Sequence, residues 1–217
     1  MTHRLKLISL AATTASLALV ATPALATAPY TVSYDGVASG DHAVTATAEG
    51  GIVFSANGID IDCSSSTVGA TVHAGTYVSS PANVATITAA TLSGCSMSGY
   101  PISFAVTSPN WALDIVDPNS PGSGLNDILN DAITNISNVA VDVNLGLLHC
   151  TFNVSGNVTS GQFLEDNGKG GQEIDINAAP GLTISNVSAG CLGVVNEGDA
   201  ATFTGQYNLD GQHINVS

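Results

Sequence analysis

The sequence has few positive charges, few aromatic residues and no apolar segment long enough to cross a membrane. Its 217 residues include three Lys and Arg against seventeen Asp and Glu, a formal net charge of −14, and aromatic residues make up 5%. The longest apolar run, from Leu7 to about Val20, is shorter than the roughly 18 to 20 residues that a spanning helix needs. An acidic surface repels nucleic acid and anionic lipid head groups. We therefore expect no nucleic-acid partner and no stable membrane insertion.

The usual sequence signatures of several enzyme classes are also missing. The chain has no phosphate-binding loop, no dinucleotide fingerprint, no Gly-x-Ser-x-Gly elbow and no zinc-binding helix pattern. Beyond the N-terminal segment it has four histidines, and alternation places two of them, His73 and His149, on a solvent-facing side; the others are His42 and His213. A triad assembled from distant loops stays open. We predict no catalytic residue and no cofactor.

The N-terminus has the pattern of a secretory signal peptide. Arg4 and Lys6 form a short positive region, the apolar run follows, and small residues surround Ala26. We place the cleavage after Ala26, so that residues 1–26 are removed. The mature chain then keeps Lys169 alone against seventeen carboxylates, a net charge of −16. We expect a secreted, extracellular protein, which in one alternative is held at the cell envelope.

Four cysteines in an exported chain predict two disulfides, and sequence alone allows three pairings. A degenerate repeat chooses among them. Cys63 and Cys150 are each followed six residues later by glycine, and a later apolar segment closes on Gly94-Cys95 or Gly190-Cys191. The repeat favours Cys63–Cys95 and Cys150–Cys191. Each bridge would stabilise the fold by about 3.5 to 4 kcal/mol through restriction of the unfolded chain.

Apolar and polar residues alternate with a period of two through most of the chain, which is typical of antiparallel strands buried on one face. The segments with this pattern include residues 59–63, 67–74, 102–107, 139–145, 148–154 and 203–207. Asn57-Gly58 and Asp210-Gly211 are turn signals. One short stretch, Gly124–Asn130, has helical spacing. Ser64-Ser65-Ser66 is expected to be a strand end or turn.

The pattern predicts about ten to twelve strands in an all-β fold, an antiparallel sandwich or barrel built from two disulfide-stapled repeats. The repeats span about 43–117 and 125–217, within a single domain of residues 27–217. The Pro- and Gly-rich stretch Asp117–Gly124 is the seam between them. The alternative is two domains joined at that seam.

Three blocks carry a resemblance to known proteins. They are Gly51–Ser55 leading to Cys63–Ser66, Pro109–Leu113, and Gly190-Cys191 leading to the segment Gly198–Tyr207. The chain resembles a group of actinobacterial secreted, β-rich, disulfide-containing proteins of unknown function. The resemblance implies the fold and the export, and it brings no catalytic or binding residue.

Two pairs of carboxylates are the weak metal candidates. Asp60 and Asp62 project from one strand face about 7 Å apart, and Glu173 and Asp175 repeat the arrangement. Such pairs can bind Ca²⁺ or serve as a glycosidase acid and base. Alternation also explains them, because the outward positions of a strand are polar. We expect ordinary surface carboxylates, with calcium as an alternative.

Trp111 is the single tryptophan. An exposed tryptophan on a sheet can stack on sugar rings, whereas one beside a turn more often covers the end of a core. We expect the second.

Together these features predict a secreted structural or binding protein without catalytic activity, with a cell-wall glycan or a surface protein as partner. One alternative is an extracellular hydrolase that uses paired carboxylates. The other is an oligomeric envelope β-barrel or pore. The oligomeric state does not follow from the sequence.

Overall fold

The computed structural model describes residues 29–118, 131–146, 149–165, 171–209 and 211–217. The expected signal peptide, most of the seam and the helical candidate Gly124–Asn130 lie outside these residues. The described chain is all-β and its strand pairs are antiparallel, as the alternation predicts. Its strands are β1 (Tyr30–Tyr34), β2 (Gly40–Ala48), β3 (Ile52–Ala56), β4 (Ile59–Tyr77), β5 (Ala82–Met97), β6 (Tyr100–Val106), β7 (Trp111–Asp117), β8 (Ala132–Leu145), β9 (Cys150–Leu164), β10 (Glu173–Ser185), β11 (Ala200–Asn208) and β12 (Ile214–Val216).

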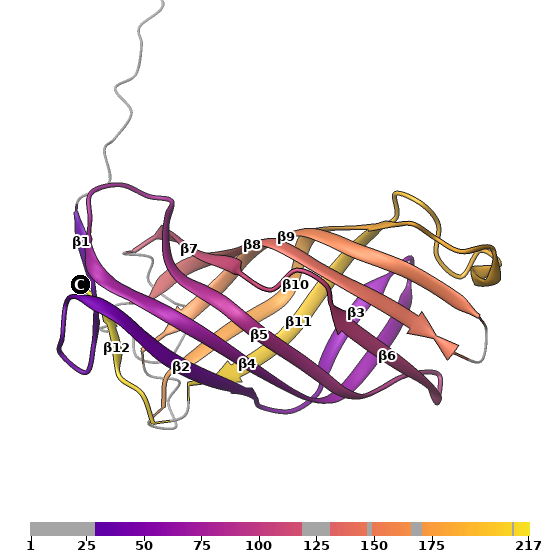
Figure 1. Ribbon diagram of the computed structural model, residues 1–217, viewed down its shortest axis with the longest axis horizontal. Coiled ribbons are helices and arrows are strands. Elements are labelled where there is room, and N and C mark those ends of the chain that lie inside the picture. The colour runs from indigo at the N-terminus through magenta and orange to yellow at the C-terminus, as the bar shows by residue number, and fades with distance from the viewer. Residues whose placement is uncertain (1–28, 119–130, 147–148, 166–170, 210) are drawn as a thin grey trace, which may run out of the picture.

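The sheet closes on itself into a barrel-like ring (Figure 1). The long strands β4, β5, β8, β9, β10 and β11 follow one another around the ring in chain order. Of these, β4 pairs with β5, β8 with β9, β9 with β10, and β10 with β11. Two positions of the ring are each shared by two short strands. β6 and β7 lie between β5 and β8, and β2 and β3 lie between β11 and β4. Strands from both halves of the sequence therefore belong to one sheet.

The alternation observed in the sequence decides which side chains face inward. Val68, Ala70 and Val72 of β4 and the valines of β8 line the interior, while the residues between them face out. Asn57 and Gly58 both have positive φ angles, 50° and 75°, in the tight turn from β3 to β4. This is the turn that an Asn-Gly pair favours between antiparallel strands.

Both expected disulfides are present, Cys63–Cys95 and Cys150–Cys191. They are not equivalent. Cys63 lies opposite Cys95 on the neighbouring strands β4 and β5, whereas Cys191 lies in η2, a single 3-10 turn (Ala189–Cys191) between β10 and β11. All four cysteines are buried.

The expectation of a strand end at Ser64–Ser66 is wrong. These residues continue β4, and Ser66 is buried at 3% exposure. The β4 side chains of Cys63 and Ser66 are both buried while the two serines between them are exposed, so the alternation breaks there. Gly94, with a φ of 61°, lies across from Ser64, and a β-carbon on it would approach the Ser64 hydroxyl to 2.1 Å. A glycine on the partner strand thus leaves room for the Ser64 side chain.

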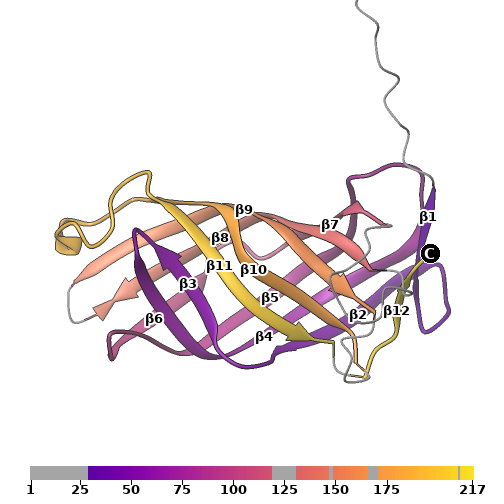
Figure 2. The same ribbon diagram turned by 180° about the vertical axis from the view of Figure 1, so that it is seen from behind.

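The two ends of the barrel differ, as Figures 1 and 2 show from opposite sides. One end carries β3, β6 and the η2 turn, and both disulfides lie toward it. At the other end β1 pairs with the last residues of β4, and β12 pairs with β1. No helix among the described residues is long and apolar enough to cross a membrane.

Candidate functional site: an apolar cavity inside the barrel

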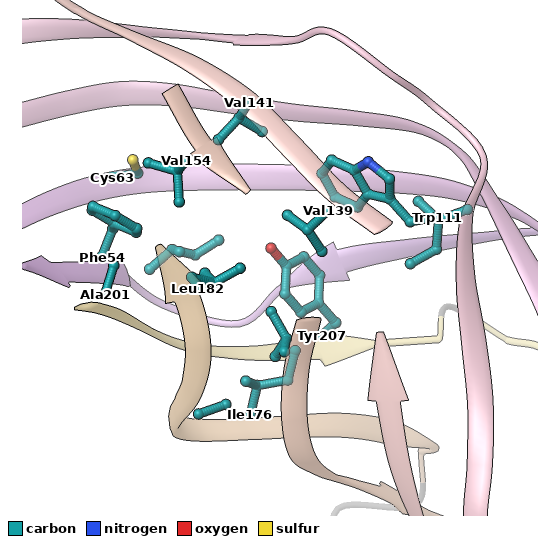
Figure 3. Close-up of a cluster of buried hydrophobic side chains, with 14 of the residues drawn as sticks. Phe54, Cys63, Trp111, Val139, Val141, Val154, Ile176, Leu182, Ala201 and Tyr207 are labelled. Atoms are coloured by element: carbon teal, nitrogen blue, oxygen red, sulfur yellow. The ribbon is translucent and has the colours of Figure 1, made fainter. Parts of the chain in front are cut away.

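The interior of the barrel contains a cavity of about 150 Å³. Its wall is apolar and is built by side chains from nearly every strand of the ring, with β1 and β12 contributing at one end; among them are Val32, Ala46, Phe54, Val139, Ile176 and Val216. Figure 3 shows Trp111, Val139 and Tyr207 lying close together in this interior although they come from β7, β8 and β11. A ring of about eight antiparallel strands encloses space for side chains or for one small ligand.

Phe54 and Phe104 separate the cavity from the disulfide end. Their rings make an edge-to-face contact, with centroids 6.4 Å apart. Beyond Phe54 lies a much smaller void of about 10 Å³, which Met97 and Leu145 help to line. The larger cavity therefore lies on the side of β1 and β12.

Tyr207 is one of the wall residues that carry a polar atom. Its hydroxyl donates a hydrogen bond to the Ser66 hydroxyl across 3.0 Å, and this bond joins β11 to β4. Burial raises the pKa of Tyr207 to about 12, and the bond to Ser66 opposes that rise. The phenol is neutral at physiological pH, so the cavity holds no charge from this residue.

Trp111 lines the cavity and is 8% exposed, so it belongs to the core and is not a surface platform for sugars. Its Nε1 is buried and has no hydrogen-bond partner among the described residues. A buried N–H group without a partner is costly.

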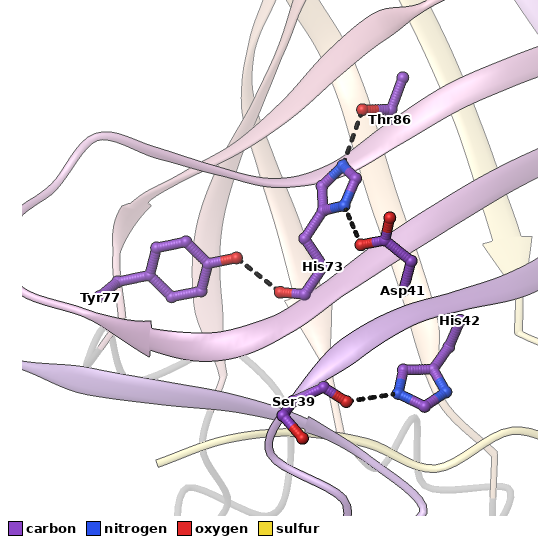
Figure 4. A network of polar contacts seen from close by, with 6 residues as sticks. All are labelled: Ser39, Asp41, His42, His73, Tyr77 and Thr86. Carbon is purple, nitrogen blue, oxygen red and sulfur yellow. Dashed lines mark hydrogen bonds and ion pairs between the residues drawn. The ribbon is translucent and has the colours of Figure 1, made fainter.

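A second arrangement lies on the outer face (Figure 4). His73 of β4 is 2.7 Å from the Asp41 carboxylate through Nδ1 and 2.9 Å from the Thr86 hydroxyl through Nε2. Asp41 and Thr86 come from the strands on either side, β2 and β5. The same atoms are used in the acid–base–nucleophile triad of hydrolases. When the proton is on Nδ1, His73 donates to Asp41 and accepts from Thr86.

The surroundings of this triad are open. The side chains of His73 and Asp41 are 34% and 69% exposed. Tyr77 lies beside them and donates its hydroxyl to the His73 carbonyl at 2.5 Å. Burial, and then the charge of Asp41, raises the pKa of Tyr77. Thr86 is paired on both sides, opposite Thr71 and Ala112, so donors for an oxyanion would have to come from outside its strand.

The structure does not bring the two predicted carboxylate pairs together. Asp60 and Asp62 are exposed near the start of β4, where Asp60 accepts a hydrogen bond from Ser55. Glu173 and Asp175 lie on β10, and Glu173 is buried at 3% exposure, so its expected place on the solvent face is wrong. Among the described residues, no group of three or more His, Cys, Asp or Glu side chains is arranged to hold a metal ion.

The walls of the cavity can be predicted from the sequence, but the cavity cannot. The inward residues of β4, β6, β8, β9 and β11 follow from alternation, yet the space that remains between them depends on how the ring closes. Asp41 was not singled out, although its position opposite His73 is a cross-strand pair of an acid and a base. The sequence does not show that these two strands are neighbours in this register.

No protein family matches the chain, and neither does any curated protein or any solved structure. The fold and the site therefore define the protein only as a class: an all-β, antiparallel, disulfide-bonded protein with an apolar cavity inside its sheet.

Proposed function

We propose that this chain is an exported binding protein that takes a small, uncharged, apolar molecule into its barrel and catalyses no reaction. The observation that carries the proposal is the cavity of about 150 Å³ with an apolar wall. An apolar cavity of this volume in another protein stays free of water and binds benzene or xenon. The same wall favours a binding protein over the pore alternative, because an aqueous channel needs a polar lining.

Export is supported by the two disulfides, since such bonds persist in oxidising compartments. The signal-peptide pattern supports it independently. The protein then meets its ligand at or near the cell envelope. It is either released there or held there by a glycan or a surface protein.

The test uses fluorobenzene as the probe and ¹⁹F NMR as the measurement. We expect saturable binding of one probe per chain. Ala46 of β2 lines the cavity, whereas Ala43 of the same strand is exposed, so Ala46→Leu and Ala43→Leu are a matched pair. The first fills part of the cavity and should weaken binding at least about tenfold, because the probe loses most of its space, while the second should leave binding unchanged.

Thermal melts of both variants show whether each is folded. A wild-type chain that binds no probe, or equal loss of binding in the two variants, would contradict the proposal. Sodium benzoate is the charged counterpart of the probe. It should not bind, because no positively charged side chain lines the described wall to offset the cost of burying a carboxylate.

A second candidate function is the hydrolysis of small esters at Asp41, His73 and Thr86, favoured by the distances of 2.7 and 2.9 Å. It ranks second because Thr86 is paired on both sides, so its own strand offers no free donors for an oxyanion. If the triad is active, p-nitrophenyl acetate should be hydrolysed faster than in buffer, and His73→Ala should abolish the excess. His42 stacks on Tyr34 and stands outside the triad, so His42→Ala is the control. Equal rates in all three proteins would remove this candidate.

A further inference from the structure

Strand β12 lies at the end of the barrel nearest to the cavity and is held differently along its two edges. Toward β1 the contact is an ordinary antiparallel ladder, in which Thr31 and Ser217 exchange two backbone hydrogen bonds and Asn215 lies opposite Ser33. In such a ladder the backbone groups of alternate residues point to opposite edges. The N–H and C=O groups of Ile214 and the N–H group of Val216 therefore point away from β1.

Within the described part of the chain, side chains rather than a strand pair with that second edge. Gln172, just before β10, accepts a hydrogen bond from the Ile214 N–H at 2.7 Å and donates one to the Ile214 carbonyl at 2.5 Å. Glu165, just after β9, accepts one from the Val216 N–H at 3.0 Å. The side chain of Gln172 thus imitates the backbone of a neighbouring strand. Its position is fixed, because it is buried at 8% exposure.

This edge also borders the cavity. The side chains of Ile214 and Val216 form part of the cavity wall, together with Val32 of β1. Elsewhere around the ring, the strands that form the wall are joined by backbone ladders, several of them long, as between β4 and β5. The other end of the barrel is tied by both disulfides and divided from the cavity by Phe54 and Phe104. Among the described residues, the bonds that a ligand breaks on passing the β12 edge are the side-chain hydrogen bonds of Gln172 and Glu165.

We propose that the ligand enters and leaves between β12 and the ends of β9 and β10, through release of Gln172 and Glu165 from β12 while β12 stays paired with β1. This inference rests on the proposed binding function and adds its route of entry. Local opening of a short strand is faster than opening of the ring, because few contacts are lost. Gln172 and Glu165 act as a latch: they set the rate of exchange and leave the bound state unchanged.

The test measures exchange of fluorobenzene between free and bound states by ¹⁹F magnetisation transfer, together with its dissociation constant. Gln172→Leu keeps the bulk of the side chain and removes both hydrogen bonds to Ile214. Exchange should become about tenfold faster, since the barrier loses two hydrogen bonds, and the dissociation constant should change little. Glu165→Ala removes the single bond to Val216. It should act in the same direction by a smaller factor, and it serves if the first variant does not fold.

Two controls separate this route from others. Ser66→Ala removes a buried side-chain hydrogen bond at the cavity wall but leaves β12 untouched, so the exchange rate should not change. Ser33→Cys combined with Asn215→Cys allows a disulfide between facing positions of β1 and β12. This disulfide would lock the β1–β12 edge, which we expect to stay closed during exchange. Exchange should again be unaffected.

Unchanged exchange in both latch variants would overturn the inference, and so would strong slowing by the β1–β12 disulfide. Neither result would touch the binding function, which fails if the wild-type chain binds no fluorobenzene or if Ala46→Leu and Ala43→Leu lose binding equally.

Discussion

Gly156 and Gly181 show how closely two backbones approach in this fold. Gly156 of β9 has a φ of 138°, and a β-carbon on it would be 2.2 Å from the Gly181 carbonyl oxygen. Gly181 of β10 has a φ of 106° and faces the Asn157 carbonyl oxygen in the same way, at 2.3 Å. The β9–β10 ladder shifts its register just there. Only residues without a β-carbon fit both the conformation and the space.

This contact explains why the second copy of the repeated Cys-x₅-Gly pattern has a glycine at position 156. It does not explain the glycine of the first copy, Gly69. Gly69, the counterpart of Gly156, has no positive φ, and a β-carbon on it would make an ordinary 3.7 Å contact with Ala89. The two glycines look alike in the sequence because the repeat shows only their spacing from cysteine. Their roles differ because the ring closes differently around each of them.

The pair makes a direct prediction. Gly156→Ala should lower the free energy of unfolding by about 2 to 4 kcal/mol, because the new methyl group meets a carbonyl oxygen that other ladder contacts hold in place. Gly69→Ala should be neutral or stabilising by up to about 1 kcal/mol, since it mainly restricts the unfolded chain. Urea unfolding of the two variants beside the wild type measures both. Equal effects would show that the close approach at Gly156 is not present.

At the scale of the strand, alternation predicted well which residues face the interior. The reason is physical: one face of each strand is buried, so that a shift of one residue would turn the whole apolar set to the solvent. The pattern fails at Ser64–Ser66 and at Glu173. At the first, β4 changes its partner from β3 to β2, and a serine is buried there that finds a partner in Tyr207, 141 positions away in the sequence. No local pattern reveals a partner at that distance.

The closure of the ring was not predictable from the strands alone. It depends on β11 pairing with both β2 and β3, which share one position of the ring between β11 and β4. Sandwich and barrel have the same alternation, since both bury one face of every strand. The cavity and the β12 latch follow from this closure, and so they too lay beyond the sequence. The disulfide pairs were predictable, because the repeat chooses one of three pairings.

At the scale of the whole molecule, the excess of negative charge works against the folded state. Seventeen carboxylates face three Lys and Arg, and two of those three lie in the expected signal peptide. The cross-strand contact between His73 and Asp41 is a salt bridge only when the histidine is protonated. Repulsion between carboxylates therefore opposes the compact state, and mobile ions reduce it.

Salt and calcium distinguish general screening from a specific site. Adding sodium chloride to about 0.5 M should raise the melting temperature by roughly 2 to 4 °C, the change that about 1 kcal/mol gives in a chain of this size. Calcium chloride at millimolar concentration, compared with sodium chloride at equal ionic strength, should give the same melting temperature. Screening depends on ionic strength, whereas a site depends on the ion and on the geometry of its oxygen ligands.

A higher melting temperature in calcium, reversed by a chelator, would contradict the screening explanation. Asp60→Asn and Asp175→Asn would then show which carboxylate pair holds the ion. Loss of the calcium effect in only one of these variants would assign the site to its strand, β4 or β10. If calcium and sodium act alike, screening alone accounts for the effect of salt, and neither carboxylate pair is a calcium site.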